Sequence, residues 1–260
     1  MIKAFSTAAT GMDAQQTMID AIANNLANVS TNGFKRTQIN FQDLLYLKLR
    51  EADREVSSGV TAPSGLEVGS GVRVASTTRN FLVGDLQSTG GELDVAIQGD
   101  GFFKLTLPSG EERYTRDGAF QKDANGLLVN ASGYQISPGI TVPQDAMSVD
   151  IAGDGTVSAL TPAGKQVLGQ LEIYRFPNNA GLSSEGGNLY RETEASGSPV
   201  AGVAGELGCG SLLSKYLEKS NVEMVTELVN LINAQRAYEI NSRTIRTGDS
   251  LLQYLTQLIR

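Results

Sequence analysis

The sequence predicts an α+β protein with an amphipathic helix at each end of the chain and a mostly-β region between them. Apolar residues recur every three or four positions in both terminal segments, which is the spacing of one helix face. The middle of the chain instead has short alternating stretches, separated by many of the 29 glycines, and no helical stripe. With no third helix to cover the two apolar faces, we expect them to pack either as a hairpin on the β region or against other copies of the chain.

Charge and composition exclude several classes of function for this 260-residue chain. A net charge of -7 disfavours binding to nucleic acid, and the absence of histidine excludes His-dependent triads and most zinc sites. The single cysteine, Cys209, cannot form an intrachain disulfide. No apolar run approaches the ~20 residues of a membrane span, and no secretory signal is visible at the N-terminus. We therefore expect no catalytic residue, cofactor, metal ion or membrane insertion.

The N-terminal segment, residues 1–34, is predicted to form a helix that ends near Val29. Asn28, Ser30 and Gly33 are typical of the residues that stop a helix. The largest apolar side chains of the segment fall seven positions apart, as in the seam of a coiled coil: Phe5, Met12, Ile19 and Leu26.

Residues 35–71 have the composition of an extended connector or a protruding loop. The stretch SSGVTAPSGLEVGSG is rich in Gly, Ser and Pro, which interrupt regular structure.

Residues 72–215 are predicted to form the central β-rich domain, whose Asn-Gly and Asp-Gly dipeptides suit tight turns. The turns at Asp100 and Asp154 lack the regular acidic spacing of a calcium loop. Residues 180–211 are expected to be a loop. The candidate strands are Val72 to Thr77, Val95 to Ile97, Phe102 to Leu105, Arg113 to Thr115, Leu127 to Val129, Val149 to Ile151, Thr156 to Ala159 and Gln170 to Phe176.

The C-terminal segment, residues 216–260, is predicted to form the second helix, capped by Ser220 or Asn221. Polar residues on the alternate row of the seam penalise wrong registers and so specify the partner. The apolar seam itself consists of Met224, Leu228, Leu231, Tyr238, Ile245 and Leu252.

Four segments resemble signatures of the bacterial flagellar rod and hook proteins, in the same order along the chain. They are ANNLANVSTNGFKR from Ala23, DVAIQGDGFF from Asp94, YTRDGAF from Tyr114, and SNVEMVTELVNLINAQRAYEINSR from Ser220. One departure from the family pattern is Lys215, where the family usually has glycine, which leaves open whether the backbone approaches closely there. The residues that match the first signature most directly are Asn24, Asn25, Leu26, Ala27, Asn28, Gly33, Phe34 and Lys35.

This resemblance implies that the terminal helices pair as a coiled coil and that the chain is a structural subunit of the distal rod. The chain length, the DLLY run at Asp43 to Tyr46 before the long connector, and the lack of a second outer β domain favour the distal rod. Such a subunit polymerises into a hollow helical drive shaft that crosses the periplasm, transmits torque from motor to hook and passes export substrates. The implied partners are other copies of the chain, other rod subunits, hook-side proteins, the basal-body rings and the type III export apparatus.

Two alternatives remain open from the sequence. A proximal rod or hook subunit shares both terminal signatures. A different class, a periplasmic carbohydrate-binding module or an enzyme, would need carboxylates such as Glu111, Glu112 and Asp117 to meet in one cleft. Because acidic residues on hairpin loops are usually only solvated, we expect that the protein is not an enzyme.

Overall fold

The computed structural model describes residues 2–50, 55–57, 60–61, 64–206 and 208–258. The chain divides into two units. The helical unit comprises Met1–Leu26, Thr37–Thr78 and Glu223–Arg260, and the β unit comprises Ala27–Arg36 and Arg79–Val222. Parts of the predicted connector, residues 51–54, 58–59 and 62–63, lie outside the described residues.

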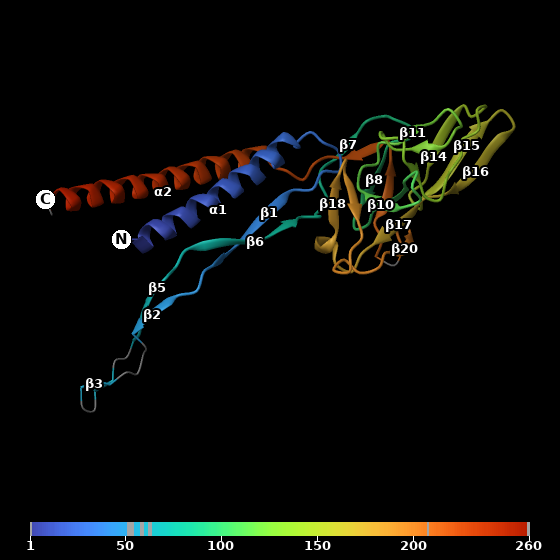
Figure 1. Ribbon diagram of the computed structural model, residues 1–260. Helices are drawn as coiled ribbons and strands as arrows, with labels where there is room; N and C mark the ends of the chain where they lie inside the picture. The colour runs from blue at the N-terminus through green and yellow to red at the C-terminus, as the bar shows by residue number, and fades with distance from the viewer. Residues whose placement is uncertain (1, 51–54, 58–59, 62–63, 207, 259–260) are drawn as a thin grey trace. The chain divides into compact units, whose positions relative to one another are not determined.

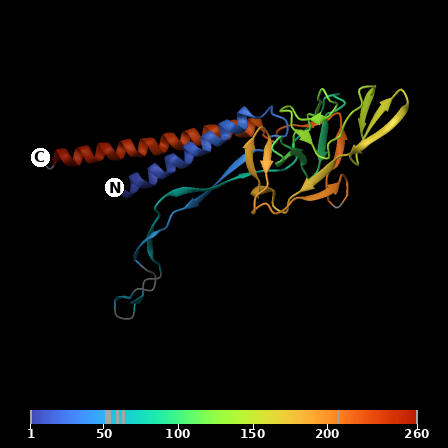
Figure 2. The ribbon, with the colours of Figure 1, turned by 45° about the vertical axis from the view of Figure 1, so that its right-hand side comes forward.

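The helical unit is built on two long helices, α1 (Ile2–Ala27) and α2 (Met224–Leu258), which lie side by side and run antiparallel (Figures 1 and 2). The start of α1 is close to the end of α2, where Phe5 contacts Gly248. Both predicted helices and their pairing are therefore confirmed. The helix α1 ends within two residues of the expected position, at a turn in which the Thr31 N–H donates to the Asn28 carbonyl at 3.2 Å.

The start of α2 differs from the sequence prediction. The helix begins at Met224, and Glu223, whose carbonyl accepts the Glu227 N–H at 3.0 Å, opens its first turn. Asn221 does not cap the helix, because its side-chain amide binds backbone groups of the β unit instead. The preceding residues form a strand, β22 (Tyr216–Glu218).

The predicted connector is largely a long antiparallel ribbon within the helical unit (Figure 1). Its strands pair successively, β1 with β6, β2 with β5 and β3 with β4, with Leu47 opposite Val68 in the second pair. Leu45, between β1 and β2, is 90% exposed, so the ribbon does not bury this apolar side chain in a core of its own. The bounds are β1 (Thr37–Asp43), β2 (Leu47–Arg50), β3 (Glu55–Ser57), β4 (Val60–Thr61), β5 (Leu66–Val68) and β6 (Val72–Arg79).

The β unit consists of one seven-stranded sheet, one three-stranded sheet and three strand pairs. The three-stranded sheet, β14-β15-β16, lies at one end of the unit (Figure 1). The seven-stranded sheet has the order β11-β12-β13-β9-β10-β19-β18, and the pairs are β17 with β20, β21 with β8 and β22 with β7. The bounds not yet given are β7 (Leu86–Ser88), β8 (Val95–Gln98), β9 (Phe103–Thr106), β10 (Glu112–Thr115), β11 (Gln121–Lys122), β12 (Leu128–Val129), β13 (Gln135–Ile136), β14 (Ser148–Ile151), β15 (Thr156–Thr161), β16 (Gly164–Gln170), β17 (Glu172–Arg175), β18 (Ser183–Gly186), β19 (Leu189–Arg191), β20 (Val200–Val203) and β21 (Ser211–Ser214), with a 3-10 helix at Asn179–Gly181.

Every candidate strand of the sequence analysis coincides with an observed strand, but the loop expected at residues 180–211 is wrong. That segment contains β18, β19 and β20. The strand β18 has the sequence SSEG and lies at the edge of its sheet, so it has no alternating apolar pattern to reveal it.

The β unit has two apolar clusters. The larger one gathers branched side chains from both main sheets around Ile97, Leu105 and Ile173. The smaller one is aromatic and includes Tyr114 and Phe176, whose rings meet edge to face with centroids 4.8 Å apart. These clusters fix the strands from which the site described below is built.

At Lys215, between β21 and β22, the backbone is left-handed, with φ of 66°. Its N–H donates to the Asp94 carbonyl at 2.7 Å, and its carbonyl accepts the Thr89 N–H at 2.9 Å. A left-handed residue other than glycine costs about 1–2 kcal/mol, and these two hydrogen bonds hold it in place. The close backbone approach left open by the sequence is therefore present with lysine at this position.

Candidate functional site

The β unit contains a buried ionic cluster centred on the carboxylate of Glu218. Lys35 Nζ donates to Glu218 Oε1 at 2.5 Å, and Arg116 Nε lies 3.0 Å from Glu218 Oε2. The Gly84 N–H also donates to Oε1, at 2.9 Å. The side chains of Lys35 and Glu218 are fully buried and that of Arg116 is 3% exposed. The cluster joins residues that are far apart in the sequence.

The guanidinium of Arg116 connects this cluster to the DVAIQGDGFF segment. Its Nη1 donates to the carbonyls of Gly99 at 2.8 Å and Gly101 at 2.7 Å, and its Cζ lies 5.9 Å from the centre of the Phe102 ring. The first three sequence signatures thus each contribute a residue to this cluster. The fourth signature begins at Ser220, two residues after Glu218. We call the group Gly33, Lys35, Gly101, Arg116 and Glu218 the motif junction.

The Gly33 backbone passes too close to the YTRDGAF segment for any side chain to fit. A Cβ at Gly33 would lie 2.7 Å from the Asp117 nitrogen, and its φ of 66° also favours glycine. The Gly33 N–H donates to the Glu218 backbone carbonyl at 2.8 Å. This close contact explains why the signature needs glycine two residues before Lys35.

Asn221, from the fourth signature, fastens the chain that follows Lys35. Its Oδ1 accepts the Arg36 N–H at 2.7 Å, and its Nδ2 donates to the Asn80 carbonyl at 2.8 Å. The Asn80 N–H in turn donates to the Arg36 carbonyl at 2.9 Å. Backbone from three distant segments is therefore held together by one side-chain amide.

The motif junction places two cations and one carboxylate in the protein interior. Burial lowers the pKa of Lys35 to about 8, and the Glu218 carboxylate partly opposes that fall. Because the three charged side chains are buried and bonded to one another, no substrate has access to them. The arrangement is suited to holding segments together rather than to catalysis.

The lowered pKa of Lys35 predicts that the β unit becomes more stable as the pH rises above 8. Between pH values of about 8 and 10.5, Lys35 in the unfolded chain still binds a proton that Lys35 in the folded chain has released. Raising the pH over this range therefore increases the free energy of unfolding. Relative to Lys35→Met, the wild-type chain should gain on the order of 2 kcal/mol between pH 8 and 9.5. Urea unfolding followed by near-UV circular dichroism of the buried tyrosines measures this difference. A wild-type-to-variant difference that stays constant over this range would contradict it.

In the helical unit, the structure places the predicted seam residues unevenly. Phe5, Met12, Ile19, Leu26, Leu231 and Ile245 are half-buried, whereas Met224, Leu228, Tyr238 and Leu252 are exposed. The residues that are most buried in the two helices do not belong to the predicted seam: Ala8, Ala14, Ile22, Asn25, Glu227 and Ala234.

The helices approach each other closely at glycines, which accounts for this difference. A Cβ at Gly11 would lie 2.8 Å from Asn241 Nδ2, and a Cβ at Gly248 would lie 2.6 Å from the ring of Phe5. A contact row of small and polar residues therefore lies beside the row of large apolar ones. Its signal was present in the sequence as Glu227, Ala234, Asn241 and Gly248, which are seven residues apart.

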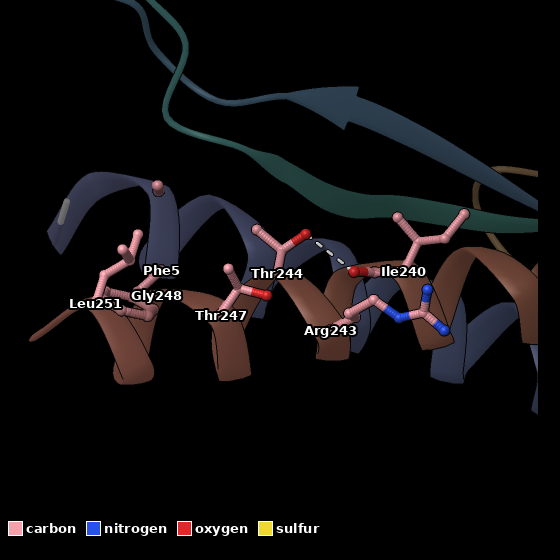
Figure 3. Close-up of a pocket in the computed structure, with 8 residues that line it drawn as sticks. Phe5, Ile240, Arg243, Thr244, Thr247, Gly248 and Leu251 are labelled. Carbon is pink, nitrogen blue, oxygen red and sulfur yellow. Dashed lines mark hydrogen bonds between the residues drawn. The ribbon is translucent and has the colours of Figure 1, made fainter. Parts of the chain in front are cut away.

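Near the start of α1 and the end of α2, the two helices leave an apolar groove of about 480 Å³ between them (Figure 3). Phe5 lies against Gly248 at one end of the groove, and Ile240 lies toward the other. The Thr244 hydroxyl is turned to its own helix, since it donates to the Ile240 carbonyl at 2.9 Å. The groove therefore offers mainly hydrocarbon to whatever covers it.

A second apolar stripe of α2 is uncovered in the chain. It consists of four side chains that are 49–69% exposed on the side of the helix away from α1: Val225, Val229, Ile232 and Tyr254. It continues at Ile240 and Leu251, which line the groove. Soluble monomers rarely expose large apolar patches without a partner. No described helix is long and apolar enough to cross a bilayer.

The remaining signature residues lie close to the end of α1. Asn25 is buried and binds the first residue of β1, accepting the Thr37 N–H and donating to the Thr37 carbonyl, both at 2.9 Å. It therefore ties the ribbon to α1 within the helical unit. Asn24 and Ala27 are exposed, and the Asn28 carbonyl accepts a hydrogen bond in the turn after the helix. Phe34 is buried, with Arg79 Cζ 5.8 Å from the centre of its ring.

The three carboxylates considered for catalysis have separate structural partners. Glu111 is 2.8 Å from Arg113, and Glu112 is 2.9 Å from Lys104. Asp117 accepts the Ala119 N–H at 3.1 Å, and burial raises its pKa. Across the part of the chain that the structure describes, no group of three or more His, Cys, Asp or Glu side chains could hold a metal ion.

Comparison with known proteins places the chain among flagellar proteins. Three family models match it: "Flagella basal body rod protein" at residues 5–35, "Flagellar hook protein FlgE/F/G D1 domain" at 96–159 and "Flagellar basal body rod FlgEFG protein C-terminal" at 213–258. Three similar proteins are named flagellar basal-body rod protein FlgG. The one from Buchnera aphidicola of Acyrthosiphon pisum is 50% identical over 99% of this chain and 100% of its own length. Those from Borreliella burgdorferi and Bacillus subtilis are 46% and 37% identical, each over 100% of both chains.

Proposed function

Because the chain belongs to the FlgG family of flagellar basal-body rod proteins, we propose that it polymerises with copies of itself into the distal rod, a hollow helical drive shaft. It is a structural protein and not an enzyme. In this role it transmits torque from the motor to the hook and leaves a lumen through which later export substrates pass.

The observation that carries the self-assembly is the exposed apolar stripe of α2. One face of this helix packs on α1, and the opposite face exposes side chains such as Val225 and Val229, which are 69% and 52% exposed. Burying an apolar side chain of this size contributes roughly 1.5–3 kcal/mol. A polymer supplies the neighbours that remove this surface from water.

The two units divide the mechanical task in this proposal. The paired helices line the inner tube, and the β unit forms the outer layer with its segments locked by the motif junction. The ribbon between residues 35 and 71 bridges neighbouring subunits, where exposed side chains such as Leu45 and Leu49 find contacts. Stiffness then arises from many such contacts acting in parallel.

The location and the other partners follow from this role. The rod crosses the periplasm as part of the flagellar basal body, and the subunit reaches it through the flagellar type III export apparatus. Its neighbours are other rod subunits, hook-side proteins and the surrounding basal-body rings, for which exposed loops of the β unit are the available surface.

The alternatives to a distal-rod subunit have less support. Proximal rod and hook subunits share the terminal signatures, but the full-length identity of up to 50% in the cited comparisons is to FlgG proteins. A carbohydrate-binding module or an enzyme would need a shared polar cleft, whereas Glu111 and Glu112 form separate ion pairs on the surface.

Leu231→Asp tests the self-assembly. Leu231 is half-buried along the α1 side of α2, so a carboxylate there should separate the helices and prevent polymerisation. The β unit should still fold, because Leu231 belongs to the helical unit. Sedimentation and electron microscopy of the purified full chain measure assembly, and near-UV circular dichroism of the buried tyrosines reports the β unit.

The matched control is Leu231→Met, which keeps an apolar side chain of similar volume and should assemble normally. Polymers of Leu231→Asp with the wild-type critical concentration would contradict the proposed role of the helices. A wild-type chain that stays monomeric at all concentrations would contradict self-assembly itself.

A further inference from the structure

We propose that the face of α1 bearing Asp13 and Asp20 packs against the face of α2 bearing Arg236 and Arg243 in a second copy of this chain. The inference rests on the proposed self-assembly and identifies the surfaces that meet. Helix pairing inside one chain would then be continued between chains by a different pair of helix faces.

Asp13, Asp20 and Arg236 lie on the sides of the helices that are turned away from the contact within the chain, and Arg243 lies at the edge of the groove between the helices. Gly11 contacts Asn241, and Asp13 follows two residues after Gly11. Two residues correspond to about 200° around a helix, so the Asp13 position lies almost opposite to that contact. The same argument applies to Asp20, two residues before buried Ile22, and to Arg236, two residues after buried Ala234.

The four side chains are free to bind another copy. Asp13, Asp20, Arg236 and Arg243 are all exposed. Within the described residues, none of the four side chains makes an ion pair or a side-chain hydrogen bond, although Glu111, Glu112 and Glu185 elsewhere all do. Glu239 lies on the same face of α2 between the two arginines and forms no ion pair with either of them among the residues that the structure describes, so the α2 face keeps a net positive charge and the α1 face a net negative one.

The spacing of the charges fits an antiparallel helix contact. Asp13 and Asp20 are seven residues apart, and so are Arg236 and Arg243, which corresponds to about 10.5 Å along each helix. In an antiparallel arrangement, like that of α1 and α2 in one chain, Asp13 is level with Arg243 when Asp20 is level with Arg236. Both pairs can form at once, which fixes one register.

The two faces are also complementary in size. Around the aspartates, α1 exposes the small side chains of Ala9 and Ala23. Around the arginines, α2 exposes Val229, Ile232 and Ile240, with exposed fractions of 52%, 49% and 65%. Small side chains on one helix let larger ones on the other approach closely, so apolar burial can accompany the ion pairs.

The contact joins two different surfaces, which decides the kind of assembly. Because the two surfaces lie on opposite sides of the helix pair, two copies cannot form both contacts with each other at once. Each addition therefore leaves one surface of each kind free, and the contact does not close into a dimer of equivalent halves. Such a heterologous contact propagates as a ring or a helix. This is the geometry that the proposed tube requires.

Two charge-reversed chains test the proposal: Asp13→Arg with Asp20→Arg, and Arg236→Asp with Arg243→Asp. Each alone would place like charges opposite each other, and we expect its critical concentration for polymerisation to rise about tenfold or more. An equimolar mixture of the two should polymerise close to wild type, because each can then offer its reversed face to the other. The chain with all four substitutions should polymerise similarly.

The measurements are sedimentation and electron microscopy of the full-length chains at one fixed ionic strength. If each reversed chain alone assembles like wild type, or if the mixture is no better than its components, the proposed contact is wrong while self-assembly stands. A wild-type chain that does not polymerise would instead overturn the proposed function. Asp13→Asn with Asp20→Asn, which removes charge without reversing it, should give a smaller rise than the reversal; an equal rise would count against charge pairing.

Discussion

Replacing Glu218 with glutamine is expected to lower the free energy of unfolding of the β unit by about 3–5 kcal/mol. The substitution keeps the shape of the side chain but removes its negative charge. Arg116, whose Nε now lies 3.0 Å from the carboxylate, then remains as a buried cation, and Lys35 loses the partner 2.5 Å from its Nζ that raises its pKa. An uncompensated buried charge is among the most destabilising changes in a folded protein.

The effect should be larger than that of removing a single cation. In Lys35→Met, Glu218 keeps Arg116 and the Gly84 N–H as partners, so one cation and one anion remain balanced. Glu112→Gln is the matched control in the same unit, since Glu112 is 51% exposed and pairs only with Lys104. An exposed ion pair contributes on the order of 0.2–1 kcal/mol.

Urea unfolding at pH 7, followed by near-UV circular dichroism, ranks the three variants. The expected order of destabilisation is Glu218→Gln, then Lys35→Met, then Glu112→Gln. The chain has no tryptophan, and the buried Tyr114 and Tyr190 both belong to the β unit, so the signal reports that unit. A Glu218→Gln chain as stable as Glu112→Gln would mean that the junction does not hold the β unit together.

Much of the helical unit could be predicted from the sequence because periodicity depends only on local spacing. The stripe from Phe5 to Leu26 predicted α1, and the stripe from Leu231 to Leu252 predicted α2. Periodicity does not say how near the two helices come. The close contacts at Gly11 and Gly248 depend on both helices at once, so Ala234 was missed as a buried position while exposed Leu252 was favoured.

The motif junction was visible in the sequence only as separate signatures. Arg116 and Glu218 are 102 residues apart, and Lys35 and Glu218 are 183 residues apart. No local rule pairs a lysine with a glutamate at that distance in the sequence. Apolar alternation found β9, in which fully buried residues alternate with partly buried ones, but β18, with SSEG at a sheet edge, has no such pattern. Long-range charge pairing and edge strands are therefore where the structure adds most.

The convergence of the signatures gives them a common physical role. Gly33 and Lys35 come from the first signature, Gly101 from the second, Arg116 from the third, and Asn221 of the fourth lies three residues after Glu218. Each supplies either a close backbone approach or a buried polar bond. In the drive shaft proposed above, fastening the segments on either side of the long helices would limit how far these segments separate.

Gly118→Ala should have an effect on the β unit comparable to that of Glu218→Gln. A Cβ at Gly118 would lie 1.6 Å from the Val95 carbonyl oxygen and 2.8 Å from the Val95 carbonyl carbon. These are backbone atoms of β8, and Val95 is fully buried, so the neighbour cannot rotate away as a surface side chain would. The Val95 N–H also donates to the Gly118 carbonyl at 3.1 Å, and moving either backbone apart would break that bond.

We expect Gly118→Ala to cost about 3 kcal/mol or more, because relieving the overlap requires a shift of a buried strand. Gly153→Ala is the matched control: its Cβ would meet only the Leu212 carbonyl oxygen, at an ordinary 3.5 Å, and it should change stability by less than about 0.5 kcal/mol. Urea unfolding of both chains measures the difference. A Gly118→Ala chain within 1 kcal/mol of the control would show that the two segments can separate without loss. The YTRDGAF turn would then not be held against β8, and its glycine would need a different explanation.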